Sequence, residues 1–152
     1  MRDMPSILFL CTGNSCRSQM ALGFMRSLHP AWHSESAGLE AHGLNPRAVA
    51  VMAELGIDIS AQPSRSIPDI RRVNGGELPA FDYVVTVCGH AHETCPHWPS
   101  AGRIIHQGFD DPPSLSAGMD DEDQVLAIYR RVRDEIRNWL DTLPAMLSNS
   151  AN

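Results

Sequence analysis

The fold of this chain is decided by one stretch of sequence, Cys11-Thr12-Gly13-Asn14-Ser15-Cys16-Arg17-Ser18. The apolar residues 7–10 come directly before it and predict a short buried strand that ends at Cys11. After it, apolar residues recur at helical spacing, namely at Met20, Ala21, Phe24, Met25 and Leu28. The stretch therefore predicts a tight loop between a strand and a helix that begins near Arg17.

A loop of this kind can hold an oxyanion. Gly13, Asn14 and Ser15 let the chain turn tightly with its N–H groups facing inward, and the helix dipole adds positive potential at the same place. Arg17 lies six residues after Cys11 and can reach back to bind two oxygens of the anion at once. We therefore predict an oxyanion-binding loop that consists of Thr12, Gly13, Asn14, Ser15, Cys16 and Arg17.

The same loop favours a reactive cysteine. The inward amides, the helix dipole and the Arg17 guanidinium all stabilise the thiolate form of Cys11, and Ser18 can donate a further hydrogen bond to its sulfur. The alternative is an inert buried cysteine beside a surface arginine, which is the usual state of a single cysteine. The residue types at these offsets favour the nucleophile.

Composition limits the class of protein. A chain of 152 residues fits one domain, which we expect to span residues 1–147 with a disordered tail at 148–152. The net charge of −6 argues against a nucleic-acid partner, and the opening apolar run is too short for a signal sequence or a membrane span. We expect a cytoplasmic monomer whose four cysteines serve catalysis, redox chemistry or metal binding rather than structural disulfides.

The order of the predicted elements gives the fold class. Three further strands are predicted at residues 32–37, 83–87 and 103–109. A second helix is predicted from Pro46 to Gly56, and a long helix follows the acidic residues 120–123. Strands that alternate with helices form right-handed β-α-β units. The sequence therefore predicts an α/β fold with a four-stranded parallel sheet flanked by helices on both faces.

Several chemically active residues directly follow predicted strands. They are Cys11, Cys88 and the pair Asp110 and Asp111. In a parallel sheet the carboxyl ends of the strands meet at one edge, where ligands bind, so these residues are expected to lie together. An acid that faces an anion-filled pocket holds its proton and can protonate a leaving oxygen. We assign this role to Asp111, with Asp110 as the competing candidate.

Residues 88–97 contain a second group of reactive side chains, namely Cys88, His90, His92, Cys95 and His97. These ligand types could bind zinc, although six residues between the two cysteines is wider than the usual zinc knuckle. The two cysteines could instead form a redox pair, or they could be structural. The sequence alone leaves these three interpretations open.

The redox interpretation has a geometrical consequence. In a helix over residues 89–95, Cys88 and Cys95 would lie about 10 Å apart along the axis. A disulfide needs Cα atoms within about 7 Å of each other, so this segment would have to loosen before the pair could form one. Neighbouring strands are only about 4.8 Å apart, so Cys88 could attack an adduct on Cys11 directly if the two strands are adjacent.

Together these residues resemble a known family. Cys-x5-Arg-Ser after the first strand and Asp-Pro after the last are typical of low-molecular-weight protein tyrosine phosphatases. The fuller resemblance is to the thioredoxin-coupled arsenate reductases that share their fold. It rests on CTGNSCRSQM at 11–20, SAG at 36–38, VTVC at 85–88 with Cys95, GFDDP at 108–112 and RRVRDEI at 130–136. The resemblance covers nearly the whole chain.

The resemblance implies a three-cysteine relay that reduces arsenate to arsenite. Cys11 attacks arsenate held by the loop and Arg17, and Asp111 protonates the departing oxygen. Cys88 then attacks Cys11 and expels arsenite, and Cys95 attacks Cys88 to leave a Cys88–Cys95 disulfide. Thioredoxin reduces this disulfide with electrons from NADPH through thioredoxin reductase, so no bound cofactor and no metal are implied. Cys16 has no role in the relay and is expected to pack near the loop.

The sequence departs from some relatives at a potassium site beside the loop. Asn14 and Ser36 match two of its ligands, but Leu22 stands where a glutamate would be, and Arg65 aligns near an aspartate. We therefore expect that this protein needs no potassium and that the Arg65 guanidinium replaces the charge of the ion.

Two other functions compete with arsenate reduction. One is tyrosine phosphatase activity. A phosphatase that binds phosphotyrosine would be expected to carry aromatic residues after Asp-Pro, whereas this chain has Pro113, Ser114 and Leu115 there. A weak phosphatase activity is expected in any case, because phosphate and arsenate share shape and charge. The other is a zinc-bound regulatory or storage module built on residues 88–97.

Overall fold

The computed structural model describes residues 5–88, 98 and 101–150. Its centre is a sheet of four strands, β1 (Ser6–Cys11), β2 (His33–Gly38), β3 (Phe81–Thr86) and β4 (Ala101–His106). All neighbouring pairs are parallel, and the spatial order is β2-β1-β3-β4. The predicted α/β fold with a four-stranded parallel sheet is confirmed.

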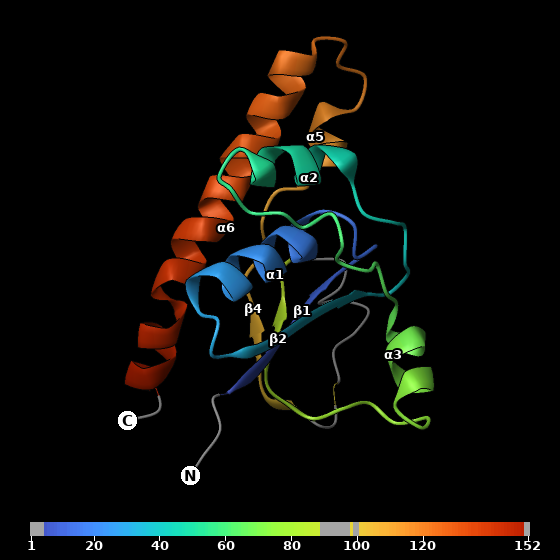
Figure 1. The fold of residues 1–152 in the computed structure, drawn as a ribbon, viewed down its shortest axis with the longest axis vertical. Helices are drawn as coiled ribbons and strands as arrows, with labels where there is room; N and C mark the ends of the chain where they lie inside the picture. The colour runs from blue at the N-terminus through green and yellow to red at the C-terminus, as the bar shows by residue number, and fades with distance from the viewer. Residues whose placement is uncertain (1–4, 89–97, 99–100, 151–152) are drawn as a thin grey trace.

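Helices connect the strands and surround the sheet (Figure 1). They are α1 (Arg17–Leu28), α2 (Pro46–Ala53), α3 (Ile67–Val73), α5 (Pro112–Ser116) and α6 (Glu122–Ser150). The long helix α6 packs against α1, α2 and α5, whereas α3 contacts the edge strand β2. Because α6 continues to Ser150, its backbone extends past residue 147, where we expected the domain to end. The domain limits remain a prediction.

Local sequence signals explain where the helices begin. The Asn45 side chain accepts hydrogen bonds from the amides of Arg47 and Ala48, and Pro46 occupies the first turn of α2. Ser66 and Asp69 form a reciprocal capping box at the start of α3. Each N-cap accepts hydrogen bonds from backbone amides that have no partner within the first helical turn.

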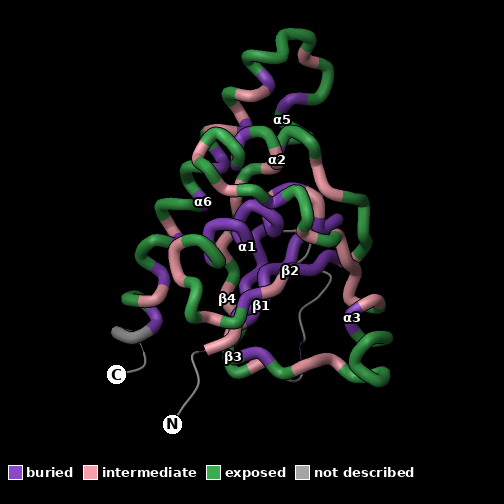
Figure 2. Tube along the Cα trace, viewed as in Figure 1, coloured by how far each residue is buried: buried purple, intermediate pink, exposed green. Residues whose placement is uncertain are grey.

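The first strand forms the centre of the core. Residues 7–10 are at most 1% exposed, because β2 and β3 flank β1 on both sides and helices cover it. Figure 2 shows this buried centre, surrounded by more exposed helices. On α6, buried apolar residues recur at helical spacing, namely Val125, Tyr129, Val132, Ile136, Leu140, Leu143 and Leu147. In the part of the chain that the structure describes, no helix is long and apolar enough to cross a membrane.

An ion-pair cluster fastens α2 to α6. The Glu54 carboxylate binds Arg130 at 2.7 Å and Arg133 at 2.7 Å. Arg133 is 7% exposed and also donates to the Val51 carbonyl at 2.9 Å. The hydrogen bond from Arg130, together with Arg133, holds the pKa of Glu54 below its usual range.

We expect Glu54→Gln to lower the free energy of unfolding by about 1 kcal/mol at neutral pH, because Glu54 is partly exposed. A carboxylate with a depressed folded-state pKa stabilises the protein above the unfolded-state value, about 4.3, and this contribution is lost as the pH falls through the folded-state value. Urea unfolding at several pH values should therefore show the difference shrinking in acid. Glu135→Gln is the matched control, because Glu135 binds Arg131, a partly exposed residue in its own helix. A pH-independent difference would contradict the prediction.

Candidate active site

The loop after β1 is held in shape by the segment that follows β2. The carbonyl oxygens of Thr12, Gly13 and Ser15 accept hydrogen bonds from the amides of Glu40, His42 and Asn45, at 3.0, 2.9 and 3.0 Å. Because these carbonyls point outward, the N–H groups of the same peptide units point toward the inside of the loop. This is the arrangement that the sequence predicts for an oxyanion-binding loop.

A cavity of about 370 Å³ lies inside the loop. Its lining consists of Cys11, Thr12, Gly13, Ser15, Cys16, Arg17, His42, Asn45, Asp111 and Pro113. The structure thus brings the predicted nucleophile, the predicted arginine and the predicted acid to one cavity, although they come from three places in the sequence. Asn14 and Ser18 do not line it and are fully buried behind the loop.

Cys11 is 3% exposed, and its sulfur lies 2.8 Å from the Ser18 hydroxyl oxygen. The Asn14 amide donates to that same hydroxyl oxygen at 2.9 Å. While this oxygen accepts from Asn14, the Ser18 hydroxyl still has its proton available to donate to the sulfur. This is the hydrogen bond that would support a thiolate at Cys11.

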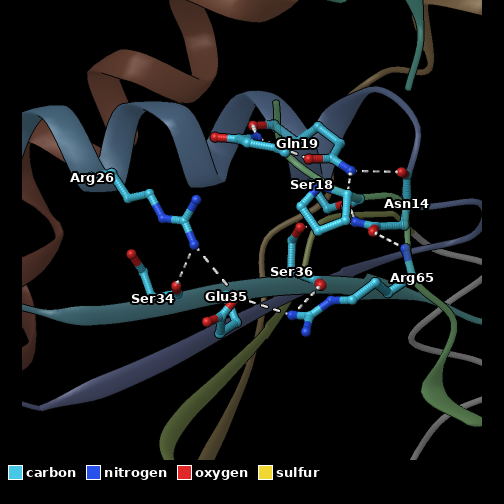
Figure 3. Close-up of polar contacts among 10 residues, drawn as sticks. Asn14, Ser18, Gln19, Arg26, Ser34, Glu35, Ser36 and Arg65 are labelled. Carbon is cyan, nitrogen blue, oxygen red and sulfur yellow. Dashed lines mark hydrogen bonds and ion pairs between the residues drawn. The ribbon is translucent and has the colours of Figure 1, made fainter. Parts of the chain in front are cut away.

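Asn14 is the central residue of a buried polar network (Figure 3). Its φ angle is 47°, in the left-handed region that asparagine tolerates better than most residues. Besides Ser18, its amide donates to the Ser36 hydroxyl at 2.9 Å, and its side-chain oxygen accepts from the Arg65 amide at 2.7 Å. Its backbone carbonyl accepts from the Gln19 side chain at 2.9 Å. Asn14 therefore ties the loop to β2 and to the segment before α3.

We expect Asn14→Ala to lower the free energy of unfolding by about 2–4 kcal/mol, because it removes three buried hydrogen bonds and leaves a β-carbon at a positive φ. Chemical unfolding, together with calorimetric titration of phosphate, would measure the losses of stability and of oxyanion affinity. Asn14→Gly separates the two causes, since glycine adopts this φ freely. A change below 1 kcal/mol in both variants would show that the network is dispensable.

The Arg17 guanidinium leaves its Nε donor available for an anion. Its Nη1 donates to the Phe109 carbonyl at 3.1 Å, and its Nη2 lies 3.4 Å from Asp111 Oδ1. Its Nε is buried and has no hydrogen-bond partner in the described part of the chain. An unpartnered buried donor is costly unless something accepts from it. An oxyanion in the cavity would satisfy it.

The structure distinguishes the two candidate acids. Asp110 forms an ion pair with Arg131 of α6 at 3.2 Å and does not line the cavity. Asp111 lines the cavity, and its side chain is 34% exposed. Of the two, Asp111 is the acid placed to exchange a proton with a bound oxyanion.

Cys88 lies beside the loop. Its strand β3 is the neighbour of β1, and the pairing continues past the strand end, where the Val87 amide donates to the Leu10 carbonyl at 2.9 Å. The Cys88 sulfur lies 3.5 Å from the Thr12 hydroxyl and is 2% exposed. Cys95 and the three histidines of the second group lie outside the described residues. The alternatives for that group are therefore not resolved.

Cys16 lines the cavity but is only 4% exposed. Burial raises the pKa of its thiol strongly, and the neighbouring Cys11 adds to the effect. Cys16 therefore stays a neutral thiol at physiological pH, while its neighbour is the candidate nucleophile. This agrees with the packing role expected from the sequence.

Two residues that line the cavity, His42 and Asn45, were not predicted from the sequence. The His42 ring packs on Gly13, where an added β-carbon would lie 2.3 Å from its Nδ1 atom, and Glu40 binds the other ring nitrogen. Asn45 donates from its side chain to the Tyr129 hydroxyl at 3.1 Å. Only their position in the sequence could have indicated this role, because their segment follows the carboxyl end of β2.

Comparison with known proteins shows which family this chain resembles. The family described as low molecular weight phosphotyrosine protein phosphatase matches residues 6–151. The chain belongs to this family. Within it, similar proteins include the arsenate reductases of Halalkalibacterium halodurans and Bacillus subtilis. The first is 50% identical over 137 residues, covering 90% of this chain and 92% of that protein. The second is 50% identical over 135 residues, covering 88% and 91%.

Solved structures of the phosphatase family agree. An arsenate reductase in the phosphate-binding state superposes with a TM-score of 0.74 at 32% identity, covering 94% of this chain and 98% of that one. The low-molecular-weight protein tyrosine phosphatase of T. tengcongensis gives a TM-score of 0.69 at 28% identity, covering 93% and 99%. The predicted resemblance to this superfamily and its arsenate reductases is confirmed.

The residues beside the loop do not fit a potassium ion. The Asn14 side-chain oxygen is occupied by the Arg65 amide, and Leu22 is 2% exposed and supplies no ligand. The Arg65 guanidinium lies instead 2.9 Å from Glu35 and 3.5 Å from the Ser36 carbonyl. The expected replacement of the ion by the Arg65 guanidinium stays a prediction.

We therefore expect turnover to be the same in potassium and sodium salts at equal ionic strength. The measurement is the initial rate of arsenate reduction in the two salts, with choline chloride as a third condition. An increase of several-fold with potassium but not with sodium would contradict both the prediction and the role given to Arg65.

Proposed function

We propose that this protein reduces arsenate to arsenite by a three-cysteine relay, in the cytoplasm and as a monomer, as a step of arsenic detoxification. The named activity of relatives that are 50% identical over most of the chain supports the reaction. The observation that carries the proposal is the position of Cys88, whose sulfur lies 3.5 Å from the Thr12 hydroxyl at the start of the loop. Hydrolysis of a phosphate ester does not require a second thiol at this place.

In the first step the Cys11 thiolate attacks arsenic, and a sulfur–arsenic bond forms as an arsenic–oxygen bond breaks. The loop amides and Arg17 hold the remaining oxygens, including the one that meets the free Nε donor. Asp111 gives its proton to the departing hydroxyl, which leaves as water. Arsenic remains pentavalent at this point.

In the second step the Cys88 thiolate attacks the Cys11 sulfur. A Cys11–Cys88 disulfide forms, the sulfur–arsenic bond breaks, and its electron pair stays on arsenic, which leaves as arsenite. The two sulfur atoms together lose the two electrons that arsenic gains. The parallel pairing of β1 and β3 supports this step, because it brings the two strand ends side by side.

In the last steps Cys95 attacks Cys88, which frees Cys11 and moves the disulfide to Cys88–Cys95. Thioredoxin then exchanges its dithiol with this disulfide and is itself reduced by NADPH through thioredoxin reductase. The protein thus needs no bound cofactor.

The experiment that tests the proposal is arsenate-dependent NADPH oxidation in the presence of thioredoxin and thioredoxin reductase. Wild type should turn over continuously, whereas Cys95→Ser should complete at most one cycle. Cys16→Ser is the matched control, because it removes a buried thiol that has no place in the relay. If neither wild type nor Cys95→Ser oxidises NADPH but both hydrolyse an aryl phosphate, the protein is a phosphatase.

A further inference from the structure

The side chain of Ser114 is hydrogen-bonded to Asp111, the acid in the cavity. It lies in the first turn of α5, which begins directly after Asp111, and its hydroxyl donates to Asp111 Oδ2 at 2.7 Å. Asp111 occupies the N-cap position, yet its side chain accepts no hydrogen bond from a backbone amide of the helix. The carboxylate is therefore held by another side chain rather than used as a helix cap.

The two oxygens of Asp111 have different partners. Oδ2 accepts from Ser114, and Oδ1 lies 3.4 Å from Arg17 Nη2. Arg17 and Ser114 together fix the plane of the carboxyl group in the ligand-free cavity. An oxyanion in the cavity would compete with Asp111 for the donors of Arg17, whereas the Ser114 hydroxyl lies on the other carboxyl oxygen and would remain bound.

We propose that Ser114 is a positioning residue that keeps Asp111 Oδ1 directed at the leaving oxygen during the reaction. The inference rests on the proposed function, in which Asp111 is the proton donor. Because the serine hydroxyl donates to Oδ2, the carboxyl proton of the acid form lies on Oδ1. As the sulfur–arsenic bond forms, that proton passes from Oδ1 to the departing oxygen, and Asp111 is left as the carboxylate that Ser114 still binds.

The first test is steady-state kinetics of Ser114→Ala in arsenate reduction. The lost hydrogen bond should lower kcat by about fivefold to tenfold. KM should change little, because the loop and Arg17 are intact. Ser114→Thr keeps a hydroxyl and should restore the rate. Ser116→Ala is the matched control, since its hydroxyl lies in the same helix but donates to the Pro113 carbonyl at 3.4 Å.

The second test uses aryl phosphates, in which Cys11 attacks phosphorus and Asp111 protonates the departing phenolic oxygen. Phenyl phosphate needs this proton more than 4-nitrophenyl phosphate, because phenolate is the poorer leaving group. Ser114→Ala should therefore slow phenyl phosphate hydrolysis more. This comparison does not depend on arsenate, so it separates a failure of the Ser114 inference from a failure of the proposed function.

A double-mutant cycle decides between positioning and a merely structural role. In the Asp111→Asn background, Ser114→Ala should have no further effect on kcat, because no proton is left to deliver. The same fold-loss in both backgrounds would overturn the proposal, as would equal losses for the two aryl phosphates. A Ser116→Ala loss as large as that of Ser114→Ala would assign the effect to the helix itself.

Discussion

Replacing Cys11 with serine is expected to abolish arsenate reduction, with a loss of about 10³-fold or more, or at least about 4 kcal/mol of transition-state stabilisation. A serine hydroxyl is a far weaker nucleophile than a thiolate. The loop amides, Arg17 and the Asn14 network are unchanged by this substitution. Phosphate affinity, measured by calorimetric titration, should therefore stay close to that of wild type.

The contrast between lost turnover and retained binding is the informative result. Ser18→Ala provides a graded comparison, because it removes only the hydroxyl 2.8 Å from the Cys11 sulfur and should lower the rate without abolishing it. If Cys11→Ser kept substantial arsenate turnover, another thiol would have to be the nucleophile. Loss of phosphate binding as well would mean that the sulfur holds the loop in shape.

Cys88→Ser is expected to separate the two reactions that this cavity could perform. Arsenate turnover should fall about 10³-fold or more, because no thiol is left to attack Cys11 and expel arsenite. Hydrolysis of an aryl phosphate needs only Cys11, Arg17 and Asp111, and should be retained. Parallel assays of NADPH oxidation and aryl phosphate hydrolysis on the same preparation would measure both.

Mass spectrometry adds a direct observation to these rates. After one addition of arsenate, wild type should accumulate a disulfide that contains Cys88, and Cys88→Ser should not. Cys16→Ser is the comparison for the loss of a buried thiol: whatever its rate, it should still accumulate the disulfide that contains Cys88. Arsenate reduction that survives in Cys88→Ser would exclude the relay and leave an external thiol as the second reactant.

Much of the fold could be predicted because its signals are local. The apolar residues 7–10 are buried on both sides, and the burial of α6 follows the helical spacing of its apolar residues. The convergence of Cys11, Cys88 and Asp111 followed from a topological rule, since strand ends of a parallel sheet share an edge.

What could not be predicted depends on contacts between distant residues. The helix α5 was not predicted from the sequence. Asp-Pro-Pro is more typical of a turn, although proline is tolerated in the first helical turn. No sequence pattern shows that the His42 ring packs on Gly13 or that Asp110 pairs with Arg131. These contacts depend on the paths of separate segments. The choice between Asp110 and Asp111 therefore required the structure.

The burial of Cys11 and Cys88, at 3% and 2% exposure, determines which molecules can take part in the chemistry. At this exposure a protein reductant cannot bring its own sulfur to either atom without a change of conformation around the cavity. The cavity of about 370 Å³ offers room for a small oxyanion. In the proposed relay, Cys95 carries the disulfide from this cavity to thioredoxin. On that proposal the chain's own thiols, rather than a diffusing thiol, connect arsenic to its reductant.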